Sequence, residues 1–519
     1  MKRTVAGLLG LLLLLGVVAG CGKSANTPQS STPQTKTLII GSAADLGTID
    51  PAVAMDNSAW KISYPAYDRL VQYKGSETEV EPSVAKSWEV SPDGLTWTFH
   101  LRDDVKFADG TPLDANAVKF SFDRLMKIKQ GPSEAFPTLE SVTVVDPYTV
   151  QFKLNKVFPP FLSTLATNGG SIVNPAVMKH EKDGDMGQNW LATHTEGSGP
   201  YQVAEWQPSQ YIKLAANAGY WGGKPKLDTI LIKTIKDPSA QRMALEKGDI
   251  DIAENIPVDQ MEELKKNPDI NVFESPSLMV DYLYLNTQKP ALSNPKVRQA
   301  ISYAIDYQGI ISGVWQGNAT QMRGPIPEGL WGHDPGVFQY TRDVAKAKAL
   351  LQEAQAGNLT LTLMYSDGKA WWEPEAQIIQ NNLADIGITV KLEKIAYATQ
   401  REKIDKGDFD MTLGVWSPDY ADPYMFMNYW FDSNNFGLAG NRAFYKNPQV
   451  DGLVREAATI TDAQKRVELY RQAQDIIMQD APYVFLVQKN YQLPMRKSVQ
   501  GFVFNPMLQD MYNFQGMDK

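Results

Sequence analysis

The chain of 519 residues contains a single cysteine, Cys21, and only four histidines. One thiol cannot close an intramolecular disulfide, so the stability of the fold must come from packing. The histidines are His100, His180, His194 and His333, and none of them has the spacing of a metal-binding motif. We therefore expect no metal site and no cofactor.

The motifs of hydrolytic enzymes and of nucleic-acid-binding proteins are also missing. Neither G-x-S-x-G nor H-E-x-x-H occurs, and Ser198 in the stretch GSGPY lacks the spacing of a nucleophile elbow. The net charge is -9 and there is no basic run, which argues against nucleic-acid binding. We expect a protein that is not an enzyme. A lipid-anchored extracellular hydrolase and a surface sensor remain the alternatives.

The one long apolar run lies at the N-terminus, where Leu8 to Val18 follow Lys2 and Arg3. A positive head and a short apolar core are typical of a secretory signal peptide, here residues 1–20. The core is shorter than the roughly 20 residues that span a bilayer. Because no later segment reaches that length without charges, the remaining chain is predicted to form a soluble globular body.

The end of the signal reads VAGC, which resembles the bacterial lipobox. The resemblance implies that Cys21 becomes the first mature residue and carries a lipid; the alternative is an ordinary signal peptide with an incidental cysteine. Residues 22–36 read GKSANTPQSSTPQTK and offer almost nothing to bury, so residues 21–36 are predicted to be a disordered tether. We expect an extracytoplasmic protein anchored to the outer face of the cell membrane, or on the periplasmic side in a Gram-negative cell.

Helical and strand patterns alternate along the rest of the chain. Asn294-Pro295 supplies an N-cap and a first-turn proline for a helix, and a second helix is predicted from Asp343 to Ala356 with Gly357 as its C-cap. Further strands are predicted at 37–42, 95–101, 142–145, 149–154, 359–364, 411–415 and 483–487, and further helices at 116–126 and 463–479. This alternation indicates an α/β fold.

Four blocks in sequence order carry a family resemblance. They are Ser87 to Met126 (SWEVSPDGLTWTFHLRDDVKFADGTPLDANAVKFSFDRLM), Gly197 to Gly223 with GSGPY and YWGG, Leu245 to Asp251 (LEKGDID), and Tyr284 to Asp306 with LNTQKPALSNPKVRQAISYAID. These blocks look like the extracellular solute-binding proteins of the peptide, opine and nickel class, the receptors of ABC importers. The resemblance spans nearly the whole mature chain, which is similar to oligopeptide- and dipeptide-binding proteins.

The resemblance implies a two-lobed fold of the type II periplasmic-binding-protein kind with an extra inserted domain. Mapped onto this chain, lobe I comprises residues 37–62, 195–277 and 495–519, the insert residues 63–194, and lobe II residues 278–494. A ligand that bridges both lobes binds the closed state better and shifts the population toward it. We expect a monomer that delivers its solute to ABC transporter permease subunits. A peptide is the expected solute, and an opine, metallophore-chelated nickel or an oligosaccharide are the alternatives.

One stretch matches the ammonium site of peptide-binding relatives. Trp416 to Pro423 reads WSPDYADP, directly after an apolar strand. The resemblance implies that Asp419 pairs with the ligand's α-ammonium, with Trp416 and Tyr420 as stacking surface. In the alternative interpretation, Asp419 and Asp422 only shape the turn beside the proline.

The region expected to hold the ligand carboxylate departs from the family pattern. Dipeptide-binding relatives use an arginine shortly after the strand predicted at 359–364, whereas this chain reads YSDGKAWWEPEAQ there. It offers Lys369, Trp371 and Trp372 as candidate ligand contacts but no arginine. Because a lysine ammonium cannot make the two-pronged contact of a guanidinium, strict dipeptide specificity does not follow.

The lipobox resemblance leads to a direct test. Replacing Cys21 by alanine is expected to release or misprocess the protein without changing its fold, because no other cysteine exists to carry the lipid. Intact-mass measurement of the membrane-extracted parent should show a diacyl or triacyl addition on a chain that starts at Cys21. An unlipidated mature chain cut elsewhere would contradict the assignment.

Overall fold

The computed structural model describes residues 35–519. The predicted signal peptide, Cys21 and nearly all of the predicted tether lie outside these residues. Lys36, the last residue of that tether, is already held: its backbone N–H donates to Asp228 Oδ2 (3.0 Å) and its ammonium lies 2.7 Å from Asp518. Within the described part, no helix is both long enough and apolar enough to cross a membrane.

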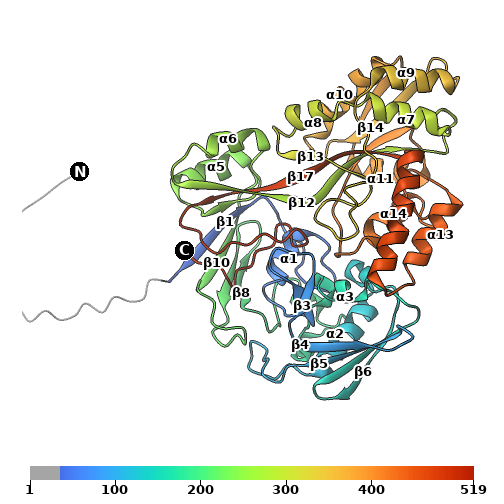
Figure 1. Cartoon of the computed structure of the whole chain (residues 1–519). Helices are drawn as coiled ribbons and strands as arrows, with labels where there is room; N and C mark the ends of the chain where they lie inside the picture. The colour runs from blue at the N-terminus through green and yellow to red at the C-terminus, as the bar shows by residue number, and fades with distance from the viewer. Residues whose placement is uncertain (1–34) are drawn as a thin grey trace, which may run out of the picture. The chain divides into compact units, whose positions relative to one another are not determined.

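One large mixed sheet runs through the molecule in the order β15-β14-β16-β12-β17-β11-β1-β10-β9-β8, with β13 beside β17 (Figure 1). The segments predicted as lobe I, called lobe I below, supply the strands at one end: β1 (Thr37–Ser42), β8 (Tyr201–Gln207), β9 (Tyr211–Ala216), β10 (Thr229–Thr234) and β11 (Ile252–Ala253). The segment predicted as lobe II, called lobe II below, supplies those at the other: β13 (Ala319–Gln321), β14 (Thr360–Ser366), β15 (Thr389–Ile395) and β16 (Met411–Trp416). The fold is the expected two-lobed α/β fold.

The two longest strands, β12 (Ile270–Leu285) and β17 (Tyr483–Arg496), belong to both lobes. They pair antiparallel from Ile270 opposite Arg496 to Tyr284 opposite Tyr483, and the register is interrupted between Pro276 and Val280. Figure 1 shows them side by side, crossing from one lobe to the other. A second irregularity follows between Asp281 and Tyr282. Bulges of this kind disrupt the ladder locally and favour a bend in the strand.

Helices cover the sheet in both lobes. Lobe I has α1 (Asn57–Ser63), α5 (Pro238–Lys247), α6 (Met261–Leu264) and the 3-10 turn η4 (Val258–Gln260). Lobe II has α7 (Pro295–Ala304), α8 (Tyr307–Gly313), α9 (Val344–Glu353), α10 (Trp372–Ala384), α11 (Tyr397–Lys406), α12 (Tyr424–Phe431), α13 (Pro448–Ala457) and α14 (Ala463–Asp480), with the turns η5 (Pro290–Leu292) and η6 (Gly437–Ala439).

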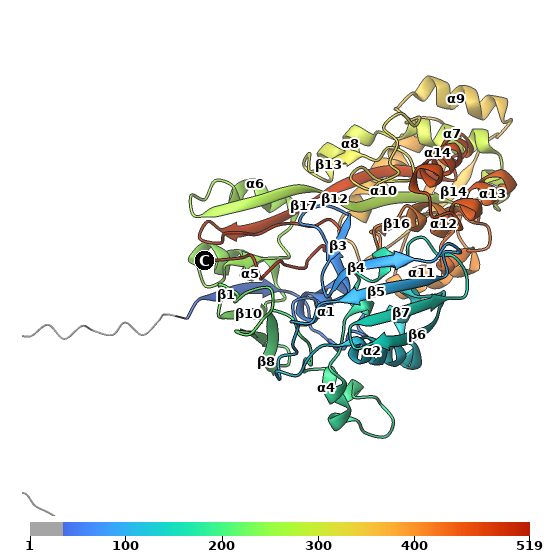
Figure 2. The same ribbon diagram turned by 60° about the horizontal axis from the view of Figure 1, so that its bottom comes forward.

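A smaller sheet forms in the region predicted as the insert, in the order β4-β5-β7-β6 (Figure 2). Its strands are β4 (Ala85–Val90), β5 (Thr96–Leu101), β6 (Leu139–Asp146) and β7 (Thr149–Leu154), and β2 (Val71–Tyr73) pairs separately with β3 (Val80–Pro82). The helical segments there are α2 (Ala115–Ile128), α3 (Phe161–Thr164), α4 (Gln188–Leu191), η1 (Gly131–Ala135), η2 (Asn168–Gly170) and η3 (Pro175–His180). Trp97, Phe99 and Leu101 are buried on one face of β5, as their alternation predicts.

The buried apolar residues of this small sheet join those of lobe II in one continuous cluster, whereas the strands of lobe I enclose a core of their own. Phe158 makes the connection, because its ring meets Tyr420 edge-on at 6.3 Å and Tyr424 at 5.6 Å. The region predicted as the insert therefore packs directly against lobe II.

Most predicted elements are present, with two differences. Asn294 caps α7 by accepting from Lys296 N–H, as expected. The predicted helix from Asp343 ends earlier than expected: α9 stops at Glu353 with Ala354 as its C-cap, so Gly357 is not the cap residue. The strand predicted at 483–487 is only the start of β17, which continues to Arg496 because its second half pairs with β12 in lobe I.

A buried ion pair fastens the small-sheet region to lobe I. The Arg124 guanidinium on α2 donates to both carboxylate oxygens of Asp50, at 2.8 and 2.5 Å. Both side chains are almost fully buried, and Asp50 also accepts from the backbone N–H of Ala52. The bidentate geometry and the extra hydrogen bond compensate the loss of hydration.

Asp50→Asn removes one charge and leaves the Arg124 guanidinium buried without a counter-charge. We expect the free energy of unfolding to fall by about 3–5 kcal/mol, because an uncompensated buried charge is costly. Asp104→Asn is the control, since the Arg102–Asp104 pair is largely exposed and such pairs contribute about 0–1 kcal/mol. Urea denaturation of both variants measures the difference, and equal losses in the two variants would contradict the assignment.

Candidate functional site

The predicted ammonium site lies in the turn between β16 and α12. Asp422 fixes this turn: it accepts from the backbone N–H of Tyr424 (2.8 Å) and receives two hydrogen bonds from the buried guanidinium of Arg466 (2.6 and 2.9 Å). Asp422 therefore shapes the turn as expected, and it also ties the turn to α14. Asp419, three residues earlier, is left free of these interactions.

Asp419 faces a cavity of about 250 Å³. Lobe I contributes Met55 and Trp60 to its lining, and lobe II contributes Asp419, Tyr420, Tyr424, Met425, Tyr429, Asn435 and Ala439. The remaining wall comes from the region predicted as the insert: Gly131, Pro132, Glu134, Ala135, Pro137, Phe158, Thr167, Asn168 and Gly169. A solute in this cavity would contact both lobes at once.

The electrostatic state of Asp419 is unusual for a carboxylate. Its side chain is exposed, yet it faces a cavity whose walls surround the carboxylate with protein on several sides. This burial raises the pKa of Asp419 to about 6, and the nearby Glu134 raises it further in the same direction. No ion pair of residues 35–519 includes Asp419. A cation placed in the cavity would stabilise the charged carboxylate that burial now penalises.

The two aromatic residues predicted beside Asp419 lie in different places. Tyr420 lines the cavity and is nearly buried. Trp416 is not among the residues that line the cavity. Its ring stacks on Tyr429 at 5.2 Å and meets Trp430 edge-on at 5.1 Å. Tyr429 is the residue of this group that reaches the cavity wall. Direct ligand contact by Trp416 and Tyr420 stays a prediction.

Lys369, Trp371 and Trp372 do not line the Asp419 cavity. Lys369 and Trp372 line a second, smaller cavity of about 40 Å³ inside lobe II, and Trp372 is 2% exposed, as a core residue would be. Trp371 packs against Trp315 at 5.3 Å, with the ammonium of Lys489 3.7 Å from the centre of its ring.

The structure adds side chains that the sequence analysis did not single out. Glu134 joins Asp419 in the larger cavity, and Arg401 and Arg442 join Lys369 in the smaller one. None of them belongs to a recognisable motif. They reach their cavities only because the fold brings together residues that lie far apart in the sequence.

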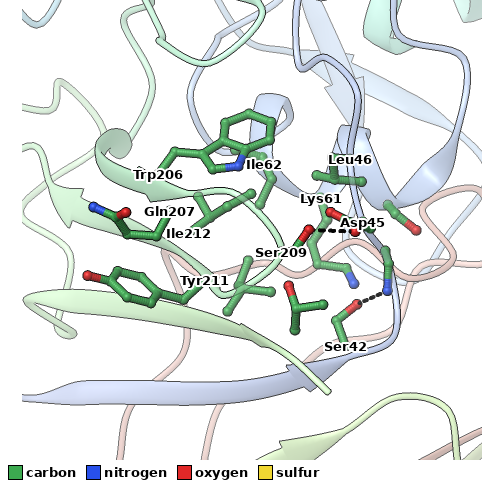
Figure 3. Close-up of a pocket in the computed structure, with 14 residues that line it drawn as sticks. Ser42, Asp45, Leu46, Lys61, Ile62, Trp206, Gln207, Ser209, Tyr211 and Ile212 are labelled. Atoms are coloured by element: carbon green, nitrogen blue, oxygen red, sulfur yellow. Dashed lines mark hydrogen bonds between the residues drawn. The ribbon is translucent and has the colours of Figure 1, made fainter. Parts of the chain in front are cut away.

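Two further cavities lie elsewhere. Figure 3 shows one within lobe I, where Ser209 Oγ donates to Asp45 (2.8 Å) beside Trp206, Ile62 and Lys61. Its volume of about 20 Å³ leaves room for about one water molecule. Another, of about 400 Å³, is lined by residues 64–81, 200–222 and 503–515 and by no residue of lobe II. The Asp419 cavity is thus the one that closure of the lobes would change most directly.

Residues 35–519 contain no group of three His, Cys, Asp or Glu side chains placed to hold a metal ion. His100 lies 3.0 Å from Glu89 on the small sheet. His180 and His194 stack on Trp190 at 3.8 and 3.6 Å.

A two-lobed α/β fold with a cavity lined from both lobes is typical of solute-binding receptors. The family model described as "Bacterial extracellular solute-binding proteins, family 5 Middle" matches residues 79–437. The chain belongs to this family.

Individual relatives agree over nearly the full length. The chain is 51% identical to the "Probable D,D-dipeptide-binding periplasmic protein DdpA" of Escherichia coli (strain K12), covering 93% of this chain and 94% of the relative. It is 32% identical to the "Dipeptide-binding protein" of the same strain, covering 92% and 94%. Among solved structures, DppA from Helicobacter pylori in complex with the peptide STSA is 31% identical over 93% of this chain and 97% of that one, with a TM-score of 0.78.

The raised pKa of Asp419 can be measured directly. We expect its carboxyl group to titrate near pH 6 in the ligand-free protein. Replacing Glu134 by glutamine should lower this pKa, yet leave it above the usual value, because burial is the larger cause. Carbon NMR of aspartate-labelled protein, with Asp419→Asn to identify the signal, gives the titration curve. A pKa near 4, the ordinary value for aspartate, would show that the cavity is open to bulk solvent.

Proposed function

We propose that this protein is an extracytoplasmic receptor that captures a peptide through its free ammonium group and delivers it to the permease of an ABC transporter. The observation that carries the proposal is the Asp419 carboxylate, which faces a cavity built by both lobes and has no cationic partner among the described residues. A charge-assisted hydrogen bond from an ammonium group would supply that partner.

Because the cavity is lined from both lobes, a bound ligand can favour lobe closure, and the permease can recognise the closed receptor. A peptide held between the lobes contacts lobe II through Asp419 and lobe I through Met55 and Trp60. These contacts exist together only when the lobes are closed, so the ligand binds the closed state better and shifts the population toward it. The permease then reads closure as occupancy.

The chemistry of the solute is supported by the relatives and by the cavity. The names of family relatives include binders of dipeptides, of glutathione and of heme, so family membership alone does not choose the ligand. The unpaired carboxylate favours a ligand with an ammonium group, and one relative, 51% identical to this chain, carries a D,D-dipeptide name. D-alanyl-D-alanine and L-alanyl-L-alanine are therefore the first ligands to test.

The remaining parts of the proposal concern where and how the receptor works. A lipid on Cys21 would hold it at the membrane surface, where it acts as a monomer and presents its cargo without altering it chemically. Recovery of an unchanged peptide after incubation with the protein distinguishes this receptor from a hydrolase.

The ammonium contact is tested by Asp419→Asn, which keeps the shape of the side chain and removes its charge. Loss of one member of a desolvated charge pair costs about 2–5 kcal/mol, so dipeptide affinity should fall by about 30-fold or more. Affinity of the parent should also drop as the pH is lowered from 7 to 5, because Asp419 becomes protonated below its pKa of about 6. Calorimetric titration measures both effects.

Asp408→Asn is the matched control, since Asp408 is an exposed aspartate of the same lobe. Asp422 is unsuitable as a control because its charge balances the buried Arg466. The ammonium contact is wrong if Asp419→Asn binds like the parent, or if an N-acetylated dipeptide binds as well as the free one.

A further inference from the structure

The cavity of about 400 Å³ lies apart from lobe II. The region predicted as the insert lines it with residues from 64–81, around the β2–β3 hairpin, and lobe I lines it with residues from 200–222 and 503–515. Its volume falls within the range of small-molecule sites, about 300–1,000 Å³. Because lobe II contributes no residue to the lining, movement of the lobes removes no part of the wall.

The charged side chains of this wall favour a neutral occupant. Asp68, Arg69 and Glu81 line the cavity. Asp68 and Arg69 are each 5% exposed, and no ion pair of residues 35–519 includes any of the three. An anion would meet two carboxylates, and a cation would meet a buried guanidinium, so either charge would be opposed by part of the wall.

The Asp68 carboxylate already has its hydrogen-bond donors. It accepts from Ser198 Oγ at 2.8 Å, from Trp221 Nε1 at 2.9 Å and from the Tyr220 hydroxyl at 3.1 Å. These three neutral donors satisfy the carboxylate without an ammonium group. In this respect the cavity differs from the one that Asp419 faces.

Other hydrogen-bonding groups on the wall remain without a partner, and they include both donors and acceptors. Arg69 donates through Nη2 to the Tyr64 carbonyl (3.2 Å), whereas its Nε and Nη1 are buried without a hydrogen-bond partner. The Tyr73 hydroxyl and Gln515 Oε1 also lack partners among the described residues. Buried polar groups are nearly always hydrogen-bonded, so these atoms favour an occupant that both donates and accepts.

Aromatic side chains form much of the remaining wall: Tyr64, Tyr67, Tyr73, Tyr220, Trp221, Tyr512 and Phe514. Such rings combine a flat apolar surface with a polar group at the edge of Tyr and Trp. A sugar ring has the complementary character, because it presents apolar C–H faces and a rim of hydroxyl groups that donate and accept. It is also uncharged, as the wall requires.

We propose that this cavity is a second ligand site, separate from the Asp419 cavity, and that it binds a neutral saccharide of one or two rings. Arg69 donates to oxygens of the sugar, Gln515 Oε1 accepts from a hydroxyl group, and the aromatic side chains cover the C–H faces. The inference does not rest on the proposed function. A ligand that contacts no residue of lobe II has no reason to prefer the closed state, so it would not signal closure.

Calorimetric titration with N-acetyl-D-glucosamine and with maltose tests the site. We expect at least one of them to bind with a dissociation constant below about 1 mM. Arg69→Met should weaken this binding by about tenfold or more, because it removes hydrogen bonds from a charged donor. Asp419→Asn should leave it unchanged, and a saturating concentration of D-alanyl-D-alanine should not displace the sugar.

A second variant examines the cavity without disturbing the buried guanidinium. Val503 is 41% exposed and lines the cavity, so Val503→Trp should fill part of the space and abolish saccharide binding. Val145→Trp is the matched control, because Val145 is 54% exposed on β6 and is not among the lining residues. Both variants should keep the melting temperature of the parent.

The outcomes keep this site distinct from the peptide function. If neither saccharide binds, or if Val503→Trp binds like the parent, the saccharide site is wrong. Displacement of the sugar by the dipeptide, or its loss in Asp419→Asn, would place the sugar in the Asp419 cavity and also overturn the proposal. Saccharide binding that is lost in Val503→Trp and kept in Asp419→Asn supports the site, whether or not a dipeptide binds.

Discussion

The pairing of β12 with β17 is the constraint on which the rest of the molecule depends. The two strands share hydrogen bonds in lobe I, lose their register between Pro276 and Val280, and pair again in lobe II up to Tyr284 opposite Tyr483. Each half of the ribbon is hydrogen-bonded into the sheet of its own lobe, so a movement of one lobe against the other would be taken up between Pro276 and Tyr282, where the register shifts. A ligand cavity that takes its walls from both lobes can then respond to rotation at a single place.

Buried charged side chains occur in two settings in this protein. Several form ion pairs within the scaffold that holds the lobes together, called the frame here, and others line the cavities. In the frame, charges are paired: Asp50 with Arg124, Asp422 with Arg466, and Asp281 with Lys489 at 3.0 Å on the two hinge strands. In the cavities, Asp419 and Arg442 have no oppositely charged partner among the described residues. Pairing is not universal in the frame, because Glu375 is also buried without an ion pair among the described residues. What distinguishes Asp419 and Arg442 is that each of them lines a cavity.

The elements that local patterns predict are the ones that the structure confirms. The apolar run of Thr37–Ser42 is β1, the Asn294-Pro295 pair begins α7, and the strands predicted at 142–145 and 149–154 lie in β6 and β7, which pair with each other. The second half of β17 was not predicted, because its sequence does not show a strand pattern. It forms a strand because it pairs with β12. Glu134 and Arg442 were not predicted for a related reason. Hydrophobic periodicity indicates which face of a helix or strand is buried, but not which side chains from distant segments meet in the fold. Family resemblance singled out Asp419, which faces the cavity shared by the lobes, whereas Trp372, chosen by residue type, is 2% exposed. Ligand contact by either residue stays a prediction.

The attachment of Lys36 has a mechanical consequence. Its backbone is bonded to Asp228, its ammonium to Asp518, and the next residue begins β1, which lies between β10 and β11 in the interior of the lobe I sheet. Any pull on the chain that precedes Lys36 therefore acts in shear on parallel hydrogen-bonded strands and bypasses the β12–β17 connection. Lobe I bears the load, and the strands that connect it to lobe II are not in the path of that pull.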